Sequence, residues 1–305
     1  MSNFLVRGHC PACGSESSES LVNNKFTEPP LSNYLESFYR AQGTIDMSLL
    51  EDGSYILTVC GECSLLYQKE IPNNELMDAL YEKWIDPDTA RKLHECYGTE
   101  YYIKQMRELA NIIFRLGDKP TRMRCLDFGM GWGIWCQIAK GFGCDVYGLE
   151  LSHARNEYAK SKGIRVVTYD SIRNMEFDFI NAEQVFEHIP SPLETLVSLK
   201  SVLSKTGIIK INVPDSWKIE SKINFKNMSN PIAFRRTLTP IQPLEHINSF
   251  SYRSLVKMGE KAGLQVTSVP EHYIYSPLDL IKSAARPMFH LLRGSRSTRV
   301  YFTHA

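Results

Sequence analysis

One stretch constrains the fold of this chain more than any other. Residues 124–133 read Arg-Cys-Leu-Asp-Phe-Gly-Met-Gly-Trp-Gly, an apolar run that turns into three alternating glycines. The next segment, residues 134–140, has apolar positions three to four apart, the spacing of an amphipathic helix. A strand, a glycine turn and a helix in this order present backbone N–H groups and a helix N-terminus to a ligand. We therefore expect an α/β domain with a ligand site at this loop.

Ile134 and two acidic residues distinguish this loop from a dinucleotide-binding loop. The dinucleotide fingerprint requires glycine or alanine three positions after Gly131, and Ile134 stands there. Asp127, at the strand end, has no role on a pyrophosphate and suits a cationic or hydroxyl-rich ligand. Glu150 follows Asp127 by 23 residues and closes a second apolar run, the usual position of an acid that binds a ribose diol. A glycine turn alone would fit any doubly wound domain, so the acids carry the argument.

The pattern Asp127-x-Gly129-x-Gly131-x-Gly133, with Glu150 after it, resembles the cofactor site of class I S-adenosylmethionine-dependent methyltransferases. The resemblance covers roughly residues 98–305. It implies an α/β fold with a doubly wound, mostly parallel, seven-stranded sheet, in which the loop cradles the methionine part and Glu150 binds both ribose hydroxyls. The residues that it assigns to the cofactor are Asp127, Phe128, Gly129, Gly131, Gly133, Glu150, Leu151, Asp170, Ser171 and Gln184. Helix or turn capping is the alternative role for Asp170.

A second resemblance follows the expected fourth strand, residues 177–183. Residues 187–192 read Glu-His-Ile-Pro-Ser-Pro, similar to the segment at this place in small-molecule O-methyltransferases of the ubiquinone-pathway type. Methyltransferases that act on nucleobase nitrogen usually show Asn or Asp followed by Pro-Pro and an aromatic residue, and residues 181–183 read Asn-Ala-Glu. We therefore expect oxygen or carbon as the methyl acceptor.

A long segment, residues 215–250, follows the expected fifth strand without clear periodicity, which is typical of a functional insertion. Its Pro-Leu-Glu-His and Asn-Ser-Phe-Ser pieces resemble zinc-containing methyltransferases that act on nucleotide-linked sugars. Some of those enzymes carry Tyr where Pro243 stands, and they have a further C-terminal domain. Histidine titrates near neutrality and suits proton removal from a hydroxyl. The candidate catalytic residues are His188, His246 and Glu245.

Half of the eight cysteines form two Cys-x-x-Cys pairs: Cys10, Cys13, Cys60 and Cys63. Four thiolates satisfy tetrahedral zinc and leave no open position, so we expect a structural Zn²⁺ site. A strand over residues 54–59 leads into the second pair, as in a zinc ribbon. The long segment between the pairs is expected to form its own subdomain around the aromatic residues 34–39. A disulfide is the alternative.

Three parts are expected along the chain: a zinc-ribbon-like domain at 1–70, linker helices at 71–97, and a methyltransferase domain at 98–305 with a substrate insert at 215–250. Helices are expected at 99–117, 152–162, 193–204, 251–262 and 277–292, and further strands at 165–170, 207–214, 265–269 and 299–303. At the start of the main domain, Tyr101, Tyr102 and Met106 either cap the cofactor cleft or pack against the sheet.

The charge balance narrows the class of partner. Lys plus Arg is 35 and Asp plus Glu is 34, which argues against a nucleic-acid or membrane-surface binder. Residues 1–7 lack the apolar core of a signal peptide. The sequence contains no run of about 18 apolar residues, the length needed to span a bilayer, so a cytoplasmic location is expected. A phosphate-bearing acceptor could meet basic residues late in the chain: Arg235, Arg236, Lys282, Arg286, Arg293, Arg296 and Arg299.

The activity expected from these features is methyl transfer from S-adenosylmethionine to a hydroxyl or activated carbon of a small molecule, with a sugar or nucleotide-linked sugar favoured. A zinc-bearing RNA methyltransferase and a non-catalytic S-adenosylmethionine-binding protein are the alternatives. Few basic residues in 14–59 and the missing Pro-Pro motif argue against the first, and the intact Asp127, Glu150 and His188 argue against the second.

Overall fold

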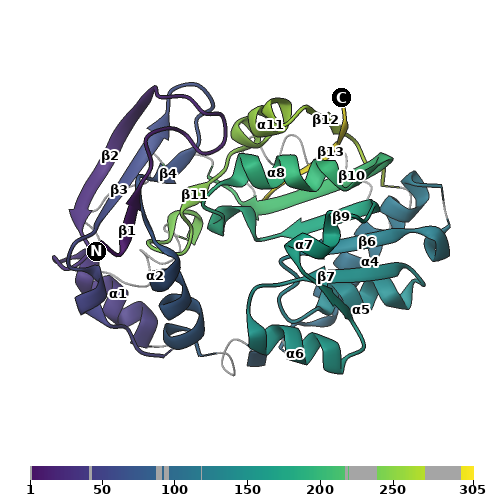
Figure 1. Ribbon diagram of the computed structural model, residues 1–305, viewed down its shortest axis with the longest axis horizontal. Helices are drawn as coiled ribbons and strands as arrows, with labels where there is room; N and C mark the ends of the chain where they lie inside the picture. The colour runs from purple at the N-terminus through teal and green to yellow at the C-terminus, as the bar shows by residue number, and fades with distance from the viewer. Residues whose placement is uncertain are drawn as a thin grey trace. The chain divides into compact units, whose positions relative to one another are not determined.

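The structure is a computed structural model of the chain (Figure 1). It describes residues 2–40, 43–86, 91–92, 96–117, 119–216, 219, 239–271 and 297–305. The chain forms two compact units. The first, here called the cysteine unit, comprises Met1–Leu93, Phe186–Leu193 and Pro214–Met258. The second, called the sheet unit, comprises His94–Val185, Glu194–Val213 and Gly259–Ala305.

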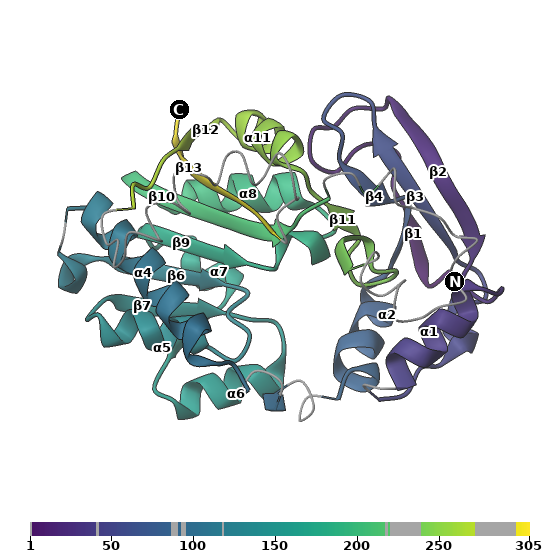
Figure 2. The ribbon, with the colours of Figure 1, turned by 180° about the vertical axis from the view of Figure 1, so that it is seen from behind.

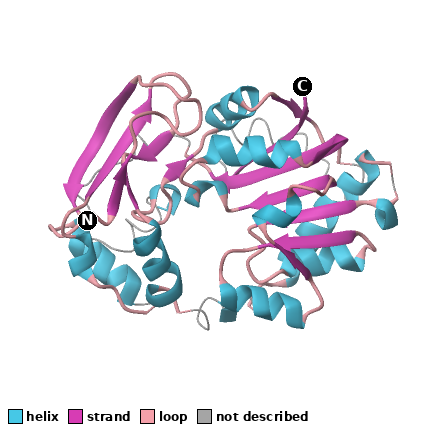
Figure 3. Ribbon diagram, in the orientation of Figure 1, coloured by secondary structure: helices cyan, strands magenta, loops and turns pink. Residues whose placement is uncertain are grey.

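The sheet unit is built on seven strands in the order β12-β13-β10-β9-β6-β7-β8 (Figure 3). The ladders that join β10, β9, β6, β7 and β8 are parallel, and β12 pairs with β13 in antiparallel fashion. This arrangement confirms the expected mostly parallel, seven-stranded α/β fold. The strands are β6 (Arg124–Phe128), β7 (Asp145–Leu149), β8 (Arg165–Val167), β9 (Phe177–Glu183), β10 (Leu203–Pro214), β12 (Leu264–Thr267) and β13 (Ser297–His304).

Helices cover both faces of this sheet, as the apolar character of its central strands requires. Helix α8 lies in front of the sheet in Figure 1, and α4 lies in front of it in the view from behind (Figure 2). A core of α4, α5 and strand side chains includes Leu109, Ile112, Trp135, Ile138 and Phe179. The helices are α4 (Thr99–Arg115), α5 (Ile134–Gly141), α6 (His153–Ser161), α7 (Tyr169–Ile172) and α8 (Pro192–Ser201), with a 3₁₀ turn, η3, at Pro120–Arg122. The bounds of the two units divide α11 (Tyr252–Lys261), which belongs to the cysteine unit as far as Met258 and to the sheet unit from Gly259.

Some element boundaries differ from those expected. The strand expected at 165–170 ends at Val167, because Thr168 and Ser171 form a capping box that starts α7. Strand β10 begins at Leu203 rather than 207, directly after α8 ends. The helix expected at 277–292 lies outside the described residues.

The cysteine unit contains a four-stranded antiparallel sheet in the order β11-β4-β3-β2 and a separate β1-β5 pair. Its aromatic core includes Phe26, Tyr34, Tyr39, Tyr55 and Trp84, and α1 supplies two of these residues from the expected 34–39 segment. The strands are β1 (Phe4–Val6), β2 (Ser18–Lys25), β3 (Ser54–Cys60), β4 (Leu66–Gln68), β5 (Glu70–Pro72) and β11 (Asn248–Ser249). The helices are α1 (Leu31–Arg40), η1 (Met47–Leu50), α2 (Asn74–Ala79), η2 (Leu80–Trp84), η4 (Phe186–His188) and η6 (Thr239–Ile241).

The expected insert at 215–250 is not grouped with the sheet that precedes it. Strand β11 adds to the cysteine-unit sheet by pairing Asn248 with Tyr67. The side chain of Gln68 donates to the carbonyls of Gln242 and His246, both at 3.0 Å. Buried Ile241 and Leu244 complete the same core. Apolar and hydrogen-bonding contacts therefore place the described part of this segment in the cysteine unit. No helix in the described ranges has both the length and the apolar character needed to cross a bilayer.

Candidate functional site

The glycine loop joins β6 to α5 as the sequence indicates. Gly129, Gly131 and Gly133 all have positive φ angles, of 72°, 54° and 72°. A Cβ atom added to Gly129 would lie 2.5 Å from Val185 Cγ2, so this glycine permits close packing within the unit. A Cβ added to Gly131 would meet no atom within 4 Å. The loop therefore turns a bare stretch of backbone toward open space, where a ligand can approach it.

Glu150 lies beside this loop, at the end of β7. Its Oε2 accepts a hydrogen bond from the Gly131 backbone N–H at 3.0 Å. Its Oε1 accepts from the backbone N–H groups of Leu151, at 2.8 Å, and Ser152, at 3.1 Å. The Arg155 guanidinium lies 3.6 Å from Oε2. The expected cofactor acid and the expected cofactor loop are thus brought together, with the acid fixed in orientation.

Asp127 lies at the end of β6 with 3% of its surface exposed. Its carboxylate accepts a 2.7 Å hydrogen bond from the Asn181 side chain and a 3.4 Å contact from the Cys136 thiol. Burial raises the pKa of Asp127 to about 6. Asn181 was not assigned a role from sequence, although a polar residue inside the apolar strand 177–183 is the signal that could have found it.

The remaining expected cofactor residues have different surroundings. Phe128 is buried and meets the ring of Tyr169 edge-on at 5.6 Å, whereas Leu151 is 85% exposed. Asp170 is exposed and forms an ion pair with Arg173 at 3.5 Å, while Ser171 takes part in the capping box of α7. Helix capping, the alternative considered for Asp170, is the role that its neighbour Ser171 performs.

Gln184 forms the turn after β9. It has a positive φ of 56°, and its backbone N–H donates to the Asn212 carbonyl at 2.7 Å. The next residue, Val185, is the one that packs against Gly129. The turn that follows the fourth parallel strand is therefore held against the glycine loop, within the sheet unit.

These features fit S-adenosylmethionine. The open space at Gly131 can receive the methionine part, and the exposed Leu151 beside Glu150 offers an apolar surface for a flat ring. The indole N–H of Trp132, inside the loop, is buried and has no hydrogen-bond partner in the part of the chain that the structure describes. A buried donor of this kind is uncommon unless a ligand completes it.

The four paired cysteines form one cluster in the cysteine unit. Their sulfur atoms all lie within 4.8 Å of one another, and all four residues are buried. The Cys10–Cys63 and Cys13–Cys60 sulfur distances are both 3.6 Å. That spacing is far longer than a disulfide bond of about 2.05 Å. It is close to the roughly 3.8 Å expected between thiolates at about 2.3 Å from a tetrahedral zinc ion.

The two cysteine turns have matching backbone hydrogen bonds. Gly14 N–H donates to the Cys10 carbonyl at 2.9 Å, and Ser64 N–H donates to the Cys60 carbonyl at 3.0 Å. Cys10 and Cys60 each donate in turn to the carbonyl five residues later, at 2.8 and 2.9 Å. Two turns of the same shape thus aim their sulfurs at one point, and the donor set fits a Zn²⁺ ion.

The expected catalytic histidines also meet within the cysteine unit. The rings of His188 and His246 lie 4.8 Å apart at an angle of 72°. The Nδ1 atom of His188 lies 2.9 Å from the Glu245 carbonyl oxygen and 3.0 Å from the Tyr81 hydroxyl. Its Nε2 atom lies 4.0 Å from a carboxylate oxygen of buried Glu187. Sequence reasoning found both histidines but assigned no role to Tyr81 or Glu187.

Burial, with a smaller contribution from His188, lowers the pKa of His246 to about 3, so this ring is neutral at physiological pH. The carboxylate of Glu245 accepts a 2.8 Å hydrogen bond from the Tyr39 hydroxyl. Ligand atoms of Glu187, His188 and His246 lie within 4.8 Å of one another, which would also allow them to share a divalent cation. The trio can therefore act in proton transfer or as metal ligands.

The basic residues expected to meet a phosphate are not brought together among the described residues. Arg299 forms a 2.9 Å ion pair with Glu108 inside the sheet unit, and its contact with a phosphate stays a prediction. The other six lie outside the described ranges: Arg235, Arg236, Lys282, Arg286, Arg293 and Arg296.

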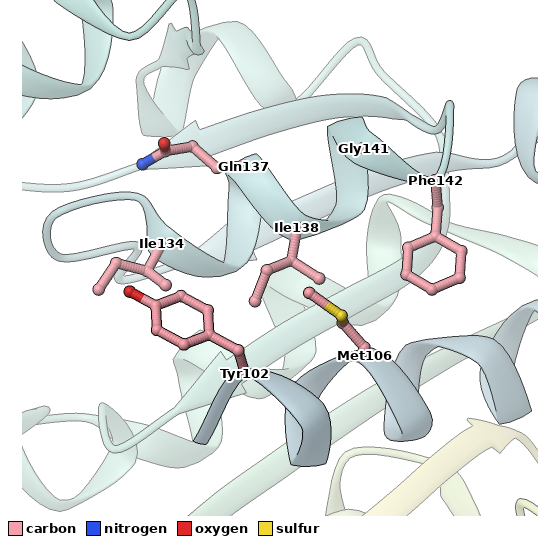
Figure 4. Close-up of a pocket in the computed structure, with 7 residues that line it drawn as sticks. All are labelled: Tyr102, Met106, Ile134, Gln137, Ile138, Gly141 and Phe142. Carbon is pink, nitrogen blue, oxygen red and sulfur yellow. The ribbon is translucent and has the colours of Figure 1, made fainter. Parts of the chain in front are cut away.

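An apolar groove of about 450 Å³ runs between α4 and α5 (Figure 4). Its lining residues are Tyr102, Met106, Ile134, Gln137, Ile138, Gly141 and Phe142. Tyr102 and Met106 therefore face the neighbouring helix α5 rather than the sheet. Tyr101 stacks on Tyr97 with ring centroids 4.1 Å apart.

The parallel sheet, the glycine loop and the acid that closes the second strand define a class I methyltransferase. Residues 100–269 match the methyltransferase domain family, which is more than half of the chain. The chain belongs to this family.

Similar individual proteins include the ubiquinone biosynthesis O-methyltransferase of Histophilus somni (strain 2336), which is 26% identical over 152 residues. The match covers 44% of this chain and 60% of that protein, less than two thirds of its length. Among solved structures, magnesium protoporphyrin IX methyltransferase (ChlM) from Synechocystis PCC 6803 has a TM-score of 0.49 at 10% identity, covering 76% of this chain and 100% of that one. A SAM dependent methyltransferase from Archaeoglobus fulgidus has a TM-score of 0.42 at 16% identity, covering 64% and 93%.

Proposed function

We propose that this protein transfers a methyl group from S-adenosylmethionine to a hydroxyl or an activated carbon of a small molecule, with a sugar or nucleotide-linked sugar as the favoured acceptor. The observation that carries the proposal is the hydrogen bond between Glu150 and the glycine loop, because the carboxylate that we assign to the ribose diol lies beside backbone that faces open space. The family match supports the reaction class. The preference for a sugar comes from the cysteine cluster and the Glu245-His246 pair, both resembling sugar methyltransferases.

The cofactor supplies an already activated methyl group, so the chain has to position the acceptor and remove its proton. Positioning alone can account for about 7–11 kcal/mol of a barrier. Gly131 and Glu150 would orient the cofactor through the loop backbone and the ribose hydroxyls. Asp127, buried at the end of β6, offers a carboxylate to the cationic part of the cofactor.

We assign proton removal to the histidine pair, with His188 as the base and His246 and Glu245 beside it. The Glu245 carbonyl can only accept a hydrogen bond, so it favours the tautomer of His188 that carries its proton on Nδ1 and leaves Nε2 unprotonated. Burial lowers the pKa of His246 to about 3, so this ring is neutral and only weakly basic. In the chain, His188 follows the end of β9 by five residues, and the segment that it resembles in small-molecule O-methyltransferases also follows the fourth strand. A base in this role contributes about 10²–10⁴-fold to the rate.

We propose that Cys10, Cys13, Cys60 and Cys63 hold one structural zinc ion. The sulfur distances, the burial of all four cysteines and the paired turns support this assignment. A tetrathiolate site leaves no position open for substrate, so the ion would stabilise the cysteine unit rather than take part in methyl transfer.

Calorimetry on the full chain tests the cofactor assignment. We expect S-adenosylmethionine to bind and Gly131→Arg to abolish binding, because the new side chain would fill the space in front of the loop. Gly141→Arg is the matched control, since Gly141 also has open space beside it but lies at the far end of α5 with no positive φ. Tight NAD binding without S-adenosylmethionine binding would refute the assignment.

A further inference from the structure

A buried chain of charges crosses the sheet unit. The Lys210 ammonium, with 1% of its side chain exposed, lies 3.0 Å from Glu108 on α4 and 2.6 Å from Glu183 on β9. Glu108 also pairs with Arg299 at 2.9 Å and accepts a hydrogen bond from the Tyr301 hydroxyl at 2.8 Å. Burial disfavours the charge on Glu108, but Lys210 and Arg299 outweigh it and hold the pKa of Glu108 at about 2. Glu108 is therefore ionised at physiological pH.

This chain of charges reaches the carboxyl edge of the sheet. In the strand register, Lys210 is opposite Asn181, and Asn181 is opposite Asp127, so the three form one row across β10, β9 and β6. Glu183 lies two residues further along β9, on the same face of the sheet as Asn181. Lys210 holds one oxygen of Glu183, and the Asn212 side chain donates to the other at 2.6 Å. Glu183 is thus fixed at the edge where the glycine loop begins.

The charges of these residues and of their ion-pair partners do not cancel. Glu108, Glu183 and Asp127 can supply three negative charges, while Lys210 and Arg299 supply two positive ones. Both hydrogen-bond partners of Asp127, Asn181 and Cys136, are neutral. When Asp127 is ionised, these described residues therefore carry one negative charge in excess, at the place where open α/β sheets bind ligands.

Aromatic rings stand beside this excess charge. Tyr101 lies seven residues before Glu108 and so on the same face of α4, and it stacks on Tyr97. Burial raises the pKa of Tyr101, and electrostatic interaction with Tyr97, Glu183 and Asp127 raises it further. Burial also raises the pKa of Tyr97, and electrostatic interaction with Glu183 is the second-largest cause of this shift. Carboxylates and aromatic faces both attract a cation, including an onium group.

We propose that Lys210 is a positioning residue through which the cofactor site distinguishes the positively charged sulfur of S-adenosylmethionine from the neutral sulfur of S-adenosylhomocysteine. Its ammonium pairs with Glu183 and favours the ionised form of Asp127. One negative charge then remains uncompensated and can attract the sulfonium of S-adenosylmethionine. This inference depends on the proposed function for the identity of the ligand. In the transfer, the acceptor oxygen or carbon would bond to the methyl group and give its proton to the base, while the sulfur–methyl bond would break with its electron pair left on sulfur. The product would be the neutral thioether S-adenosylhomocysteine. The attraction is therefore present for the substrate and absent for the product.

The sign of the pH dependence follows from Asp127. Its pKa is raised by burial to about 6, so protonation below that pH removes the excess negative charge. The two cofactor forms share their adenosine, ammonium and carboxylate groups and differ in the sulfur charge. The ratio of S-adenosylmethionine affinity to S-adenosylhomocysteine affinity should therefore rise with pH through about 6, while contributions that the two ligands share cancel.

Calorimetric titration of the full chain with each ligand between pH 5 and 8 tests this proposal. We expect the affinity ratio to rise about tenfold over this range, which corresponds to about 1.4 kcal/mol. Because the positive charge of Lys210 favours ionised Asp127, Lys210→Met should move the midpoint of the rise to higher pH, and Lys210→Arg should restore it. Glu157→Gln, which breaks the exposed Glu157–Lys160 pair on α6, is the matched control and should leave the profile unchanged.

Asp127→Asn provides a second variant in case Lys210→Met does not fold, and should give a ratio that does not change with pH. A ratio that is independent of pH in the wild-type chain would overturn the proposal. The proposal would also be overturned if the affinity ratio of Asp127→Asn, or of folded Lys210→Met, changed with pH as it does in the wild-type chain. Failure of both ligands to bind the wild-type chain at any pH would instead contradict the proposed function itself.

Discussion

The carboxylate of Glu150 accepts a 3.0 Å hydrogen bond from the backbone N–H of Gly131, and so connects the ends of two neighbouring parallel strands. The same carboxylate also accepts hydrogen bonds from the backbone N–H groups of Leu151 and Ser152. Hydrogen bonds to a charged acceptor are stronger than those to a neutral one. This contact fixes the loop and the acid in one orientation, as the proposed binding of the cofactor's nucleoside part would need.

Glu150→Gln should weaken S-adenosylmethionine binding by about tenfold to a hundredfold, because hydrogen bonds to charged groups contribute about 1.5–3 kcal/mol. The amide retains the volume of the acid but accepts with only one oxygen. Calorimetry at fixed pH checks the expected loss, and the exposed Glu157→Gln on α6 serves as the control. Unchanged affinity in Glu150→Gln would mean that this carboxylate does not contact the cofactor.

Purified, reduced protein should contain one zinc ion per chain. Cys60→Ser should lose it and lower the melting temperature, because the ion links the two cysteine turns. Cys96→Ser is the matched control, since Cys96 is an exposed cysteine outside the cluster. Elemental analysis and thermal denaturation measure both effects. Metal content well below one equivalent in the fresh wild-type chain would rule out the zinc assignment.

His188→Ala should lower turnover by about a hundredfold or more once an acceptor is known, while S-adenosylmethionine affinity stays unchanged. The reason is that His188 is assigned to the acceptor proton and not to the cofactor. His246→Ala should be assayed alongside, and His153→Ala, on the exposed start of α6, is the control. Near-normal turnover in both His188→Ala and His246→Ala would show that catalysis needs neither histidine.

Glu108→Gln should destabilise the folded chain at neutral pH by about 3–5 kcal/mol, because it leaves the buried charge of Lys210 with one partner fewer. The pKa of Glu108 is depressed from 4.5 to about 2, so its stabilising contribution is present above about pH 4.5 and is lost as the pH falls toward 2. The difference between variant and wild type should therefore shrink on acidification. Chemical denaturation at several pH values checks this, and equal stability at pH 7 would contradict it.

The sheet unit could be anticipated closely from sequence because its signals are local. Residues 124–133 form a strand and a glycine turn, and Glu150 ends the next strand, as expected. Each relation depends on chain order and on the rule that parallel strands end at one edge. The early end of β8 was missed because Thr168 and Ser171 cap a helix that has only four residues.

The longer-range contacts could not be read from the chain. Nothing local to Asn248 indicates that it pairs with Tyr67, and this pairing groups the described part of the insert with the cysteine unit. Lys210 likewise appears in sequence as one polar residue in an apolar strand. Its two carboxylate partners come from segments separated from it in the chain, so only the folded structure identifies the pairing.

The most direct test of the central claim is a turnover assay with methyl-labelled S-adenosylmethionine and a panel of nucleotide-linked sugars, free sugars and small hydroxyl compounds. Mass spectrometry would follow both the labelled product and S-adenosylhomocysteine. We predict a methylated small molecule formed in step with S-adenosylhomocysteine, and no product with Gly131→Arg. Label transfer to RNA with none to the small-molecule panel, or cofactor binding without transfer to any acceptor, would contradict the assignment of a small-molecule methyltransferase.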